Sequence, residues 1–124
     1  MSEKKRTAIV GATPNPARYA YLAAQMLTSY GHPIVPLSIK KGSVAGVELM
    51  DLREQPPLED IDTITLYLGP KNQPEWYDYL LGLQAKRLIF NPGTENPELS
   101  QLCHERGIET LNACTLVMLR SGTY

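Results

Sequence analysis

Short apolar runs alternate with amphipathic segments along almost the whole chain, and this alternation constrains the fold more than any other feature. The apolar runs predict strands at residues 7–10, 34–37, 62–68, 87–91 and 108–111. Between them, apolar residues recur every three or four positions, which is the spacing of one buried helix face. Strands that alternate with helices form parallel βαβ units with right-handed connections. We therefore expect a mostly parallel sheet flanked by helices.

Capping residues mark where the helices begin and end. Gly31 and Gly107 each follow an amphipathic segment, where glycine commonly ends a helix. Asn96 suits an N-cap, and Pro74 suits the first position of another helix. The fold class that we predict is α/β: a Rossmann-like, doubly wound, mostly parallel sheet of about five strands, in one domain spanning residues 1–124. Such sheets bind ligands in a crevice at the carboxyl ends of their strands.

Composition and charge argue against several classes of protein. The chain has 124 residues, 43% of them hydrophobic, which is enough for the core of one domain. The formal net charge of −1 provides no basic excess for nucleic-acid binding. The two cysteines have no metal-ligand spacing, so neither a metal site nor a disulfide is expected. No apolar run is long enough to cross a membrane and no leader is visible, which favours a cytoplasmic location.

The segment VGATPNPARYAY, residues 10–21, joins the first strand to the first helix and has the features of an anion-binding turn. A helix N-terminus presents unpaired N–H groups and the positive end of the helix dipole. Gly11 lets the backbone approach a phosphate, Thr13 adds a hydroxyl, and Arg18 adds a positive charge. With a single glycine, however, the segment lacks a dinucleotide fingerprint, and a stiff turn without a ligand explains it equally well.

The end of the second strand discriminates between nucleotides. In an NAD site, an acidic residue at this place binds the ribose hydroxyls. Here Pro36 suggests the strand's end or an edge position, and the chain continues as Ser38, Ile39, Lys40 and Lys41, without an acid. These lysines would attract a phosphate on the ribose, so a nucleotide ligand is expected to be NADP or coenzyme A. A solvated basic turn is the alternative interpretation.

These segments together resemble the small stand-alone CoA-binding-domain proteins, which are similar to the N-terminal Rossmann domain of the succinyl-CoA synthetase α subunit. The resemblance covers nearly the whole chain and is carried by VGATPNPARYAY, VPLSIK, NPGTEN and ACTLVML. Thr13 stands where serine is commoner in the family, and it keeps the hydroxyl. The resemblance implies coenzyme A or an acyl-CoA as both cofactor and small-molecule partner.

The resemblance also implies which residues meet the ligand. The first loop would face the pyrophosphate, the second-strand segment would lie along the 3′-phosphate end, and the ends of the next two strands would border the nucleotide. The residues implied are Gly11, Ala12, Thr13, Pro14, Asn15, Pro16, Arg18, Pro36, Lys40, Tyr67, Gly69, Asn91, Pro92 and Gly93. Asn91 stands where many relatives have glutamine. Many relatives also carry an arginine where this chain has Leu68 and Gly69, and Lys71 is the nearest cation.

No group of residues has the arrangement of a catalytic site. A nucleophile needs a base within reach and a third group to orient it. His32 and His104 are expected at the surface or at helix ends, and Glu95 as a solvated loop carboxylate. Cys114, which aligns with a cysteine frequent in the family, is the one candidate nucleophile, although a small buried residue is the commoner role for cysteine. We therefore do not expect the chain to be an enzyme.

Three functions remain open at this point. The first is binding of coenzyme A or an acyl-CoA without catalysis, as a carrier, sensor or partner subunit. The second is an NAD(P)-binding oxidoreductase, in which a homodimer would build the substrate site. The third is a regulatory interaction module with a vestigial crevice, favoured by the missing arginine. Lys40 and Lys41, with no acid beside them, disfavour NAD but do not decide between coenzyme A and an empty crevice.

Overall fold

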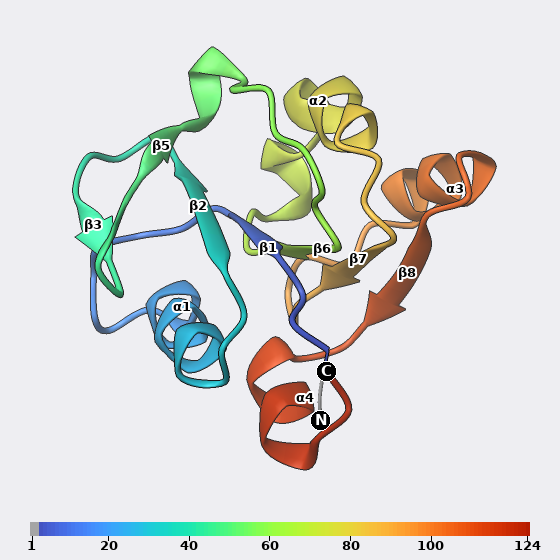
Figure 1. Cartoon of the computed structure of the whole chain (residues 1–124). Coiled ribbons are helices and arrows are strands. Elements are labelled where there is room, and N and C mark those ends of the chain that lie inside the picture. The colour runs from blue at the N-terminus through green and yellow to red at the C-terminus, as the bar shows by residue number, and fades with distance from the viewer. Residues whose placement is uncertain (1–2) are drawn as a thin grey trace.

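Parallel strands form the central sheet of the computed structural model, which describes residues 3–124 (Figure 1). The strands of this sheet are β1 (Thr7–Val10), β2 (Ile34–Ser38), β5 (Met50–Asp51), β6 (Thr63–Leu66), β7 (Arg87–Phe90) and β8 (Glu109–Asn112). Their order is β5–β2–β1–β6–β7–β8. The chain builds outward from β1 in one direction and then returns to add β6 on its other side. The switch point of this doubly wound sheet therefore lies between β1 and β6.

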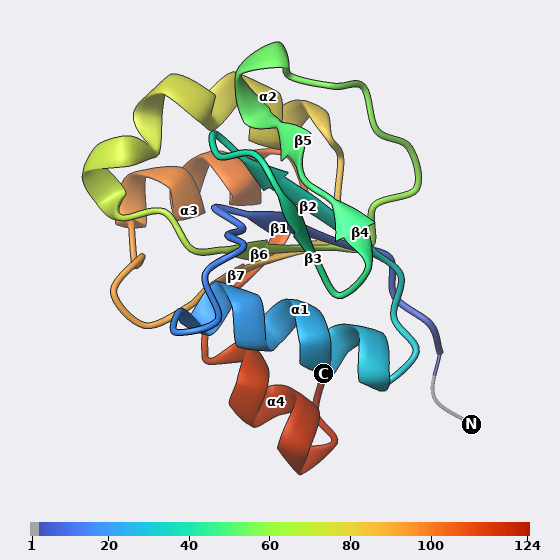
Figure 2. The same ribbon diagram turned by 90° about the vertical axis from the view of Figure 1, so that its left-hand side faces the viewer.

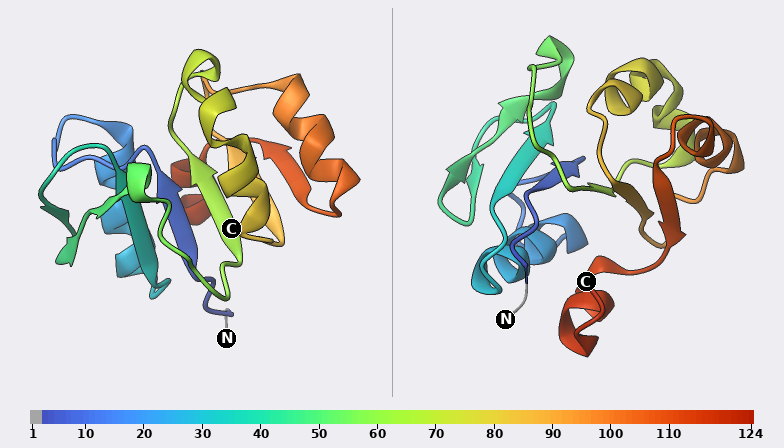
Figure 3. Two further views of the ribbon diagram at one scale, coloured as in Figure 1. Left: turned by 90° about the horizontal axis from the view of Figure 1, so that it is seen from above. Right: turned by 45° about the vertical axis from the view of Figure 1, so that its right-hand side comes forward.

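Helices cover the two faces of the sheet as separate layers. One layer contains α1 (Tyr19–Ser29) and α4 (Thr115–Ser121), and the other contains α2 (Tyr77–Gly82) and α3 (Pro97–Glu105) (Figures 2 and 3). Short 3-10 turns lie in the connections: η1 (Leu52–Glu54), η2 (Pro70–Asn72) and η3 (Pro74–Trp76). An antiparallel hairpin of β3 (Ser43–Val44) and β4 (Val47–Glu48) lies between β2 and β5. No helix among residues 3–124 is long and apolar enough to cross a membrane.

Successive residues of each strand face opposite helical layers, which gives the molecule two cores. On β1, Ala8 and Val10 belong to the cluster that contains Leu80 of α2 and Leu99 of α3. Ile9 lies between them and belongs to the cluster that contains Leu27 of α1. All four residues of β1 and all four of β6 are buried. The two strands on either side of the switch point are therefore fixed from both faces, and the loops that follow them start from rigid positions.

The predicted α/β fold class is confirmed, with two corrections to the sheet. It has six strands rather than about five, because β5 adds a two-residue pair beside Leu37 and Ser38. Pro36 lies inside β2, opposite Ile9 of β1, rather than at the end of the strand. A proline is tolerated there because β5 pairs with β2 only from Leu37 onward, so no bond of that ladder is lost at Pro36.

Asn96, Gly31 and Gly107 lie at helix ends as predicted, whereas Pro74 begins the 3-10 turn η3 and α2 begins only at Tyr77. Asn96 caps α3: its Oδ1 accepts the N–H of Glu98 at 3.1 Å and that of Leu99 at 3.3 Å. Gly31 and Gly107 follow α1 and α3 with φ of +87° and +75°, a region that glycine enters without the steric cost of a Cβ. These caps set the lengths of the helices that lead into and out of the sheet.

His32 is buried, which corrects the expectation of a surface or capping histidine. It precedes β2, at the end of the sheet opposite the switch point, and is 7% exposed. Its Nδ1 accepts the N–H of Lys5 at 3.0 Å, and its ring centroid lies 4.9 Å from that of Tyr124. Burial is the main reason why the pKa of His32 lies below its ordinary value. The charges of Lys5, Lys4 and Arg87 lower this pKa further, and Asp62 opposes them.

Acid is expected to destabilise the protein through His32. Because its pKa is lower in the folded state than the ordinary 6.5, the unfolded chain binds the proton more tightly. The stability that neutral His32 contributes is complete above pH 6.5 and is lost as the pH falls through the folded-state pKa. Urea unfolding from about pH 7.5 to 5.5 should give a flatter profile for His32→Gln than for the wild type. His104→Gln, at an exposed site, should keep the wild-type slope; equal slopes in all three proteins would contradict this assignment.

Candidate functional site

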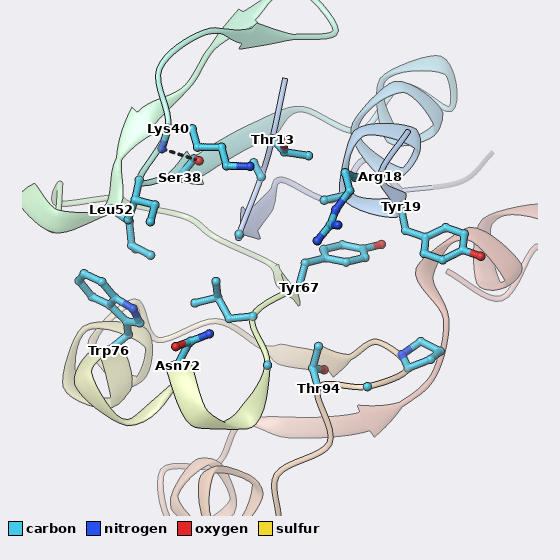
Figure 4. Close-up of a pocket in the computed structure, with 18 of the residues that line it drawn as sticks. Thr13, Arg18, Tyr19, Ser38, Lys40, Leu52, Tyr67, Asn72, Trp76 and Thr94 are labelled. Carbon is cyan, nitrogen blue, oxygen red and sulfur yellow. Dashed lines mark hydrogen bonds between the residues drawn. The ribbon is translucent and has the colours of Figure 1, made fainter. Parts of the chain in front are cut away.

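A cavity of about 690 Å³ opens at the carboxyl ends of the strands, at the switch point between β1 and β6 (Figure 4). The loops that follow β1, β2, β6 and β7 form its walls. Leu52 of η1 and Trp76 of η3 close one end of it. Four successive loops of one sheet edge therefore meet around a single space, which is large enough for a small molecule of cofactor size.

The loop after β1 is shaped by its own polar groups. The amides of Gly11 and Ala12 both donate to the carbonyl of Leu37 at 3.0 Å, which ties the loop to the end of β2. Thr13 Oγ1 accepts the amide of Asn15 at 3.1 Å, and Asn15 Oδ1 accepts the amide two residues further on at 3.0 Å. Threonine and asparagine commonly make such local turns. These two side chains hold the path of the loop toward the first turn of α1.

Backbone donors at the start of α1 lie at the cavity. Within residues 3–124, the amides of Thr13, Tyr19 and Ala20 donate to no backbone or side-chain acceptor, and all three residues line the cavity. The N-cap residue, Arg18, makes no side-chain cap, and the first turn contains no acid. A helix start with unpaired N–H groups and without a capping carboxylate is suited to an anion.

Two cations and one carboxylate are the charged residues that line the cavity among residues 3–124. Arg18 comes from the start of α1, and Figure 4 shows its guanidinium pointing into the cavity toward Tyr67. Lys40 comes from the loop after β2, where its amide donates to Ser38 Oγ at 2.9 Å. Glu75 of η3 is the carboxylate. The cations stand on separate loops, which suits a ligand with two separate anionic groups.

A buried glutamine fixes the wall on the other side of the switch point. Gln73 has no exposed surface, and its Nε2 donates to the carbonyls of Leu68 at 2.9 Å and Thr94 at 2.8 Å. Its Oε1 accepts from Nδ2 of Asn96 at 2.8 Å. The loops after β6 and β7 are thereby joined to each other and to the cap of α3. Both loops contribute to the cavity lining through residues such as Gly69 and Gly93.

Tyr67 lines the cavity and packs against the core cluster under α1. Burial raises the pKa of its phenol to about 12. The phenol is therefore protonated at neutral pH, so it can donate a hydrogen bond but is a poor proton acceptor for catalysis.

Asn91 lies outside the cavity and belongs to the scaffold. It is 2% exposed. Its Nδ2 donates to Thr65 Oγ1 at 2.8 Å and to the carbonyl of Leu66 at 3.0 Å, while its Oδ1 accepts the amide of Thr115 at 2.9 Å. Thr65 and Thr115 also share a bond between their hydroxyls at 2.8 Å. The side-chain amide of Asn91, which the family resemblance implied as a ligand contact, thus joins β6, β7 and the first residue of α4.

The structure brings most of the predicted site residues together. Those that line the cavity are Gly11, Ala12, Thr13, Arg18, Lys40, Tyr67, Gly69, Pro92 and Gly93. Pro14, Asn15 and Pro16 form the outer part of their loop, Pro36 lies within β2, and Asn91 is internal, so these five do not line it. Lining residues that sequence reasoning assigned no site role include Leu52, Asn72, Trp76 and Thr94. In the sequence Leu52 and Trp76 are recognisable only as apolar residues, and apolar residues line cavity walls and form cores alike.

The candidate nucleophile and bases are not assembled around the cavity. Cys114 does not line it. His104 Nε2 pairs with Thr110 Oγ1 at 3.0 Å on an exposed surface, and Glu95 Oε1 accepts the amide of Gly93 at 2.9 Å. Cys103 is fully buried, and burial raises the pKa of its thiol to about 11. Among residues 3–124, no three His, Cys, Asp or Glu side chains come together as a metal site would require.

Known proteins resemble this chain in sequence and in fold. The sequence matches the family described as "CoA binding domain" over residues 5–120. No curated protein matches the chain. A solved protein described as uncharacterized is 51% identical, with a TM-score of 0.96, over 99% of this chain and 100% of its own. A hypothetical protein from Pyrococcus horikoshii OT3 is 27% identical, with a TM-score of 0.81, over 95% of this chain and 83% of its own. A Thermus thermophilus protein that is 20% identical shares the fold, with a TM-score of 0.81, over 98% of this chain and 91% of its own.

Proposed function

Because the chain belongs to the CoA-binding domain family, we propose that it binds coenzyme A or an acyl-CoA in the cavity at the switch point, without catalysis of its own. The observation that carries the proposal is the pair of cations on separate loops around one cavity. Coenzyme A has two separate anionic parts, a pyrophosphate and a 3′-phosphate on the ribose. The cavity offers each of them a different partner.

The pyrophosphate is assigned to the start of α1. There Arg18 supplies a charge, and the amides of Thr13, Tyr19 and Ala20 supply donors that the chain itself does not use. Bonds from such donors to phosphate oxygens are charge-assisted and therefore stronger than neutral ones. Lys40, on the separate loop after β2, is then left for the 3′-phosphate.

The uncharged parts of the ligand need apolar surface. Leu52, Leu68 and Trp76 line the cavity beside its polar groups, and Trp76 is 8% exposed. An adenine ring or a pantetheine chain gains free energy by covering such side chains. Trp76 is also the one tryptophan of the sequence, so its fluorescence reports on this wall alone.

The absence of catalysis is part of the proposal. Arg18 and Lys40 are cations, and the Tyr67 phenol is protonated at neutral pH. The hydroxyls of Thr13, Ser38 and Thr94 line the cavity with Glu75, but each makes a local hydrogen bond to the backbone, and among residues 3–124 no histidine lines the cavity to act as their base. A carrier, a sensor or a binding subunit of a larger assembly needs no more than these groups. The end of β2, with Ser38 and Lys40 and no acid, disfavours NAD as the ligand.

Reversing the charge of Lys40 is expected to weaken the binding of coenzyme A much more than the binding of dephospho-CoA. A lost charge-assisted bond corresponds to a loss of affinity of roughly tenfold or more, and only coenzyme A carries the 3′-phosphate. Calorimetric titration of Lys40→Glu with both ligands measures the two losses. Lys41→Glu is the matched control, because it makes the same charge change at a neighbour that does not line the cavity. Equal losses for both ligands, or the same losses in the control, would reject this role.

A further inference from the structure

The loop after β1 and the loop after β2, to which the two phosphate groups are assigned, touch each other. Gly42, two residues after Lys40, has a φ of +138°. A Cβ at Gly42 would lie 3.1 Å from Cβ and 3.2 Å from Cγ of Pro14. Pro14 itself follows Thr13, which lines the cavity. The loop after β1 and the loop after β2 are therefore packed together at a point where only a residue without a side chain fits without displacing its neighbour.

The backbone on both sides of this contact is held in place. The amide of Lys40 donates to Ser38 Oγ at 2.9 Å, and the carbonyl of Gly42 accepts the amide of Leu49 at 2.9 Å. Leu49 and Val44, from the hairpin region that follows, are buried in the cluster under α1. The loop that carries Lys40 is thus anchored before and after the lysine, and Pro14 meets it from the opposite loop.

We propose that Gly42 and Pro14 are positioning residues that set the spacing between the phosphate-binding loop and Lys40, and so make the site selective for a nucleotide with a second phosphate on its ribose. The inference rests on the proposed function. A ligand held at Thr13 and at Lys40 spans this contact, so its two anionic groups are bound together only when the loops stand at one separation. Dephospho-CoA uses the first loop alone and does not depend on that separation.

The test is Gly42→Ala against Gly46→Ala. Both glycines have positive φ, and a Cβ at Gly46 (φ +78°) would meet no atom within 4 Å, so that variant carries backbone strain without a collision. Calorimetric titration with coenzyme A and dephospho-CoA gives the ratio of the two affinities. In Gly42→Ala this ratio is expected to fall roughly tenfold, mostly through coenzyme A, whereas Gly46→Ala keeps the wild-type ratio. A wild-type ratio in Gly42→Ala would overturn the inference.

A second variant covers the case in which Gly42→Ala does not fold. Pro14→Gly removes both atoms that the added Cβ would meet and adds none, so it should also lower the ratio by loosening the spacing. If the double variant folds, adding Gly42→Ala to Pro14→Gly should change the affinity ratio little further. A wild-type ratio in Pro14→Gly would contradict the proposal. A wild-type protein that binds neither ligand would instead reject the proposed function, and with it this inference.

Discussion

Replacing Asn91 with alanine is expected to cost the native state about 3 kcal/mol or more, because each buried polar group left without a partner costs roughly 1–3 kcal/mol. The substitution removes the donors to Thr65 Oγ1 and the Leu66 carbonyl and the acceptor of the Thr115 amide. These groups lie inside the protein, where water does not replace the lost bonds. Urea denaturation followed by circular dichroism measures the change in the free energy of unfolding.

Two further variants separate the hydrogen bonds of Asn91 from its shape. Asn91→Asp keeps the size of the side chain, but a carboxylate has no N–H to donate to Thr65 Oγ1 and the Leu66 carbonyl. This variant should therefore also destabilise the fold. Asn112→Ala changes an exposed asparagine on the neighbouring strand β8 and should shift the free energy by less than about 0.5 kcal/mol. Similar losses for Asn91→Ala and Asn112→Ala would show that the network of Asn91 does not stabilise the fold as described.

Gly11→Ala is expected both to destabilise the protein and to weaken coenzyme A binding. A Cβ on Gly11, whose φ is +95°, would lie 3.1 Å from the carbonyl carbon of Tyr67 and from Cδ2 of Leu68. The positive φ alone costs an alanine roughly 1–2 kcal/mol, and forcing an atom into packed surroundings adds typically 1–3 kcal/mol. The loop after β1 must then move away from the end of β6, which displaces the amides that we assign to the pyrophosphate. Coenzyme A affinity should fall roughly tenfold or more.

Gly107→Ala is the matched control for this substitution. Gly107 has a φ of +75° at the end of α3, and a Cβ there would meet no atom within 4 Å. It should show the backbone strain without the collision and without any loss of coenzyme A affinity. If the two variants lost equal stability and both retained the ligand, close packing at Gly11 would not be a requirement of the site.

The fold class and the position of the cavity are predictable from the sequence for physical reasons. The run Thr7–Val10 is buried along its whole length, as the apolar pattern of a central parallel strand requires. The carboxyl ends of parallel strands share one edge of the sheet, so Gly11 and Lys40 meet at one cavity although they are far apart in sequence. Caps such as Asn96 act through their immediate neighbours, and local sequence is sufficient to identify them.

Which polar residues are internal is not predictable in this way, because it depends on tertiary neighbours. The sequence does not distinguish Asn91 and Gln73 from exposed amides, yet both side chains are buried and hydrogen-bond to the backbone of neighbouring loops and strands. His32 is buried against Tyr124, from the other end of the chain. Strands of two residues, such as Met50–Asp51, are too short for any periodicity to show. Trp76 belongs to the core and also lines the cavity, and an apolar pattern in the sequence does not distinguish these two roles.

The most direct test of the central claim is to titrate the wild-type protein at low salt with coenzyme A, dephospho-CoA, NADP and NAD, by calorimetry and by Trp76 fluorescence. Coenzyme A should release heat and change the fluorescence, because the ligand covers the wall that contains the single tryptophan. Dephospho-CoA should bind more weakly, since it lacks the phosphate assigned to Lys40. No heat and no fluorescence change with any of the four ligands would contradict the account and direct attention to protein partners instead.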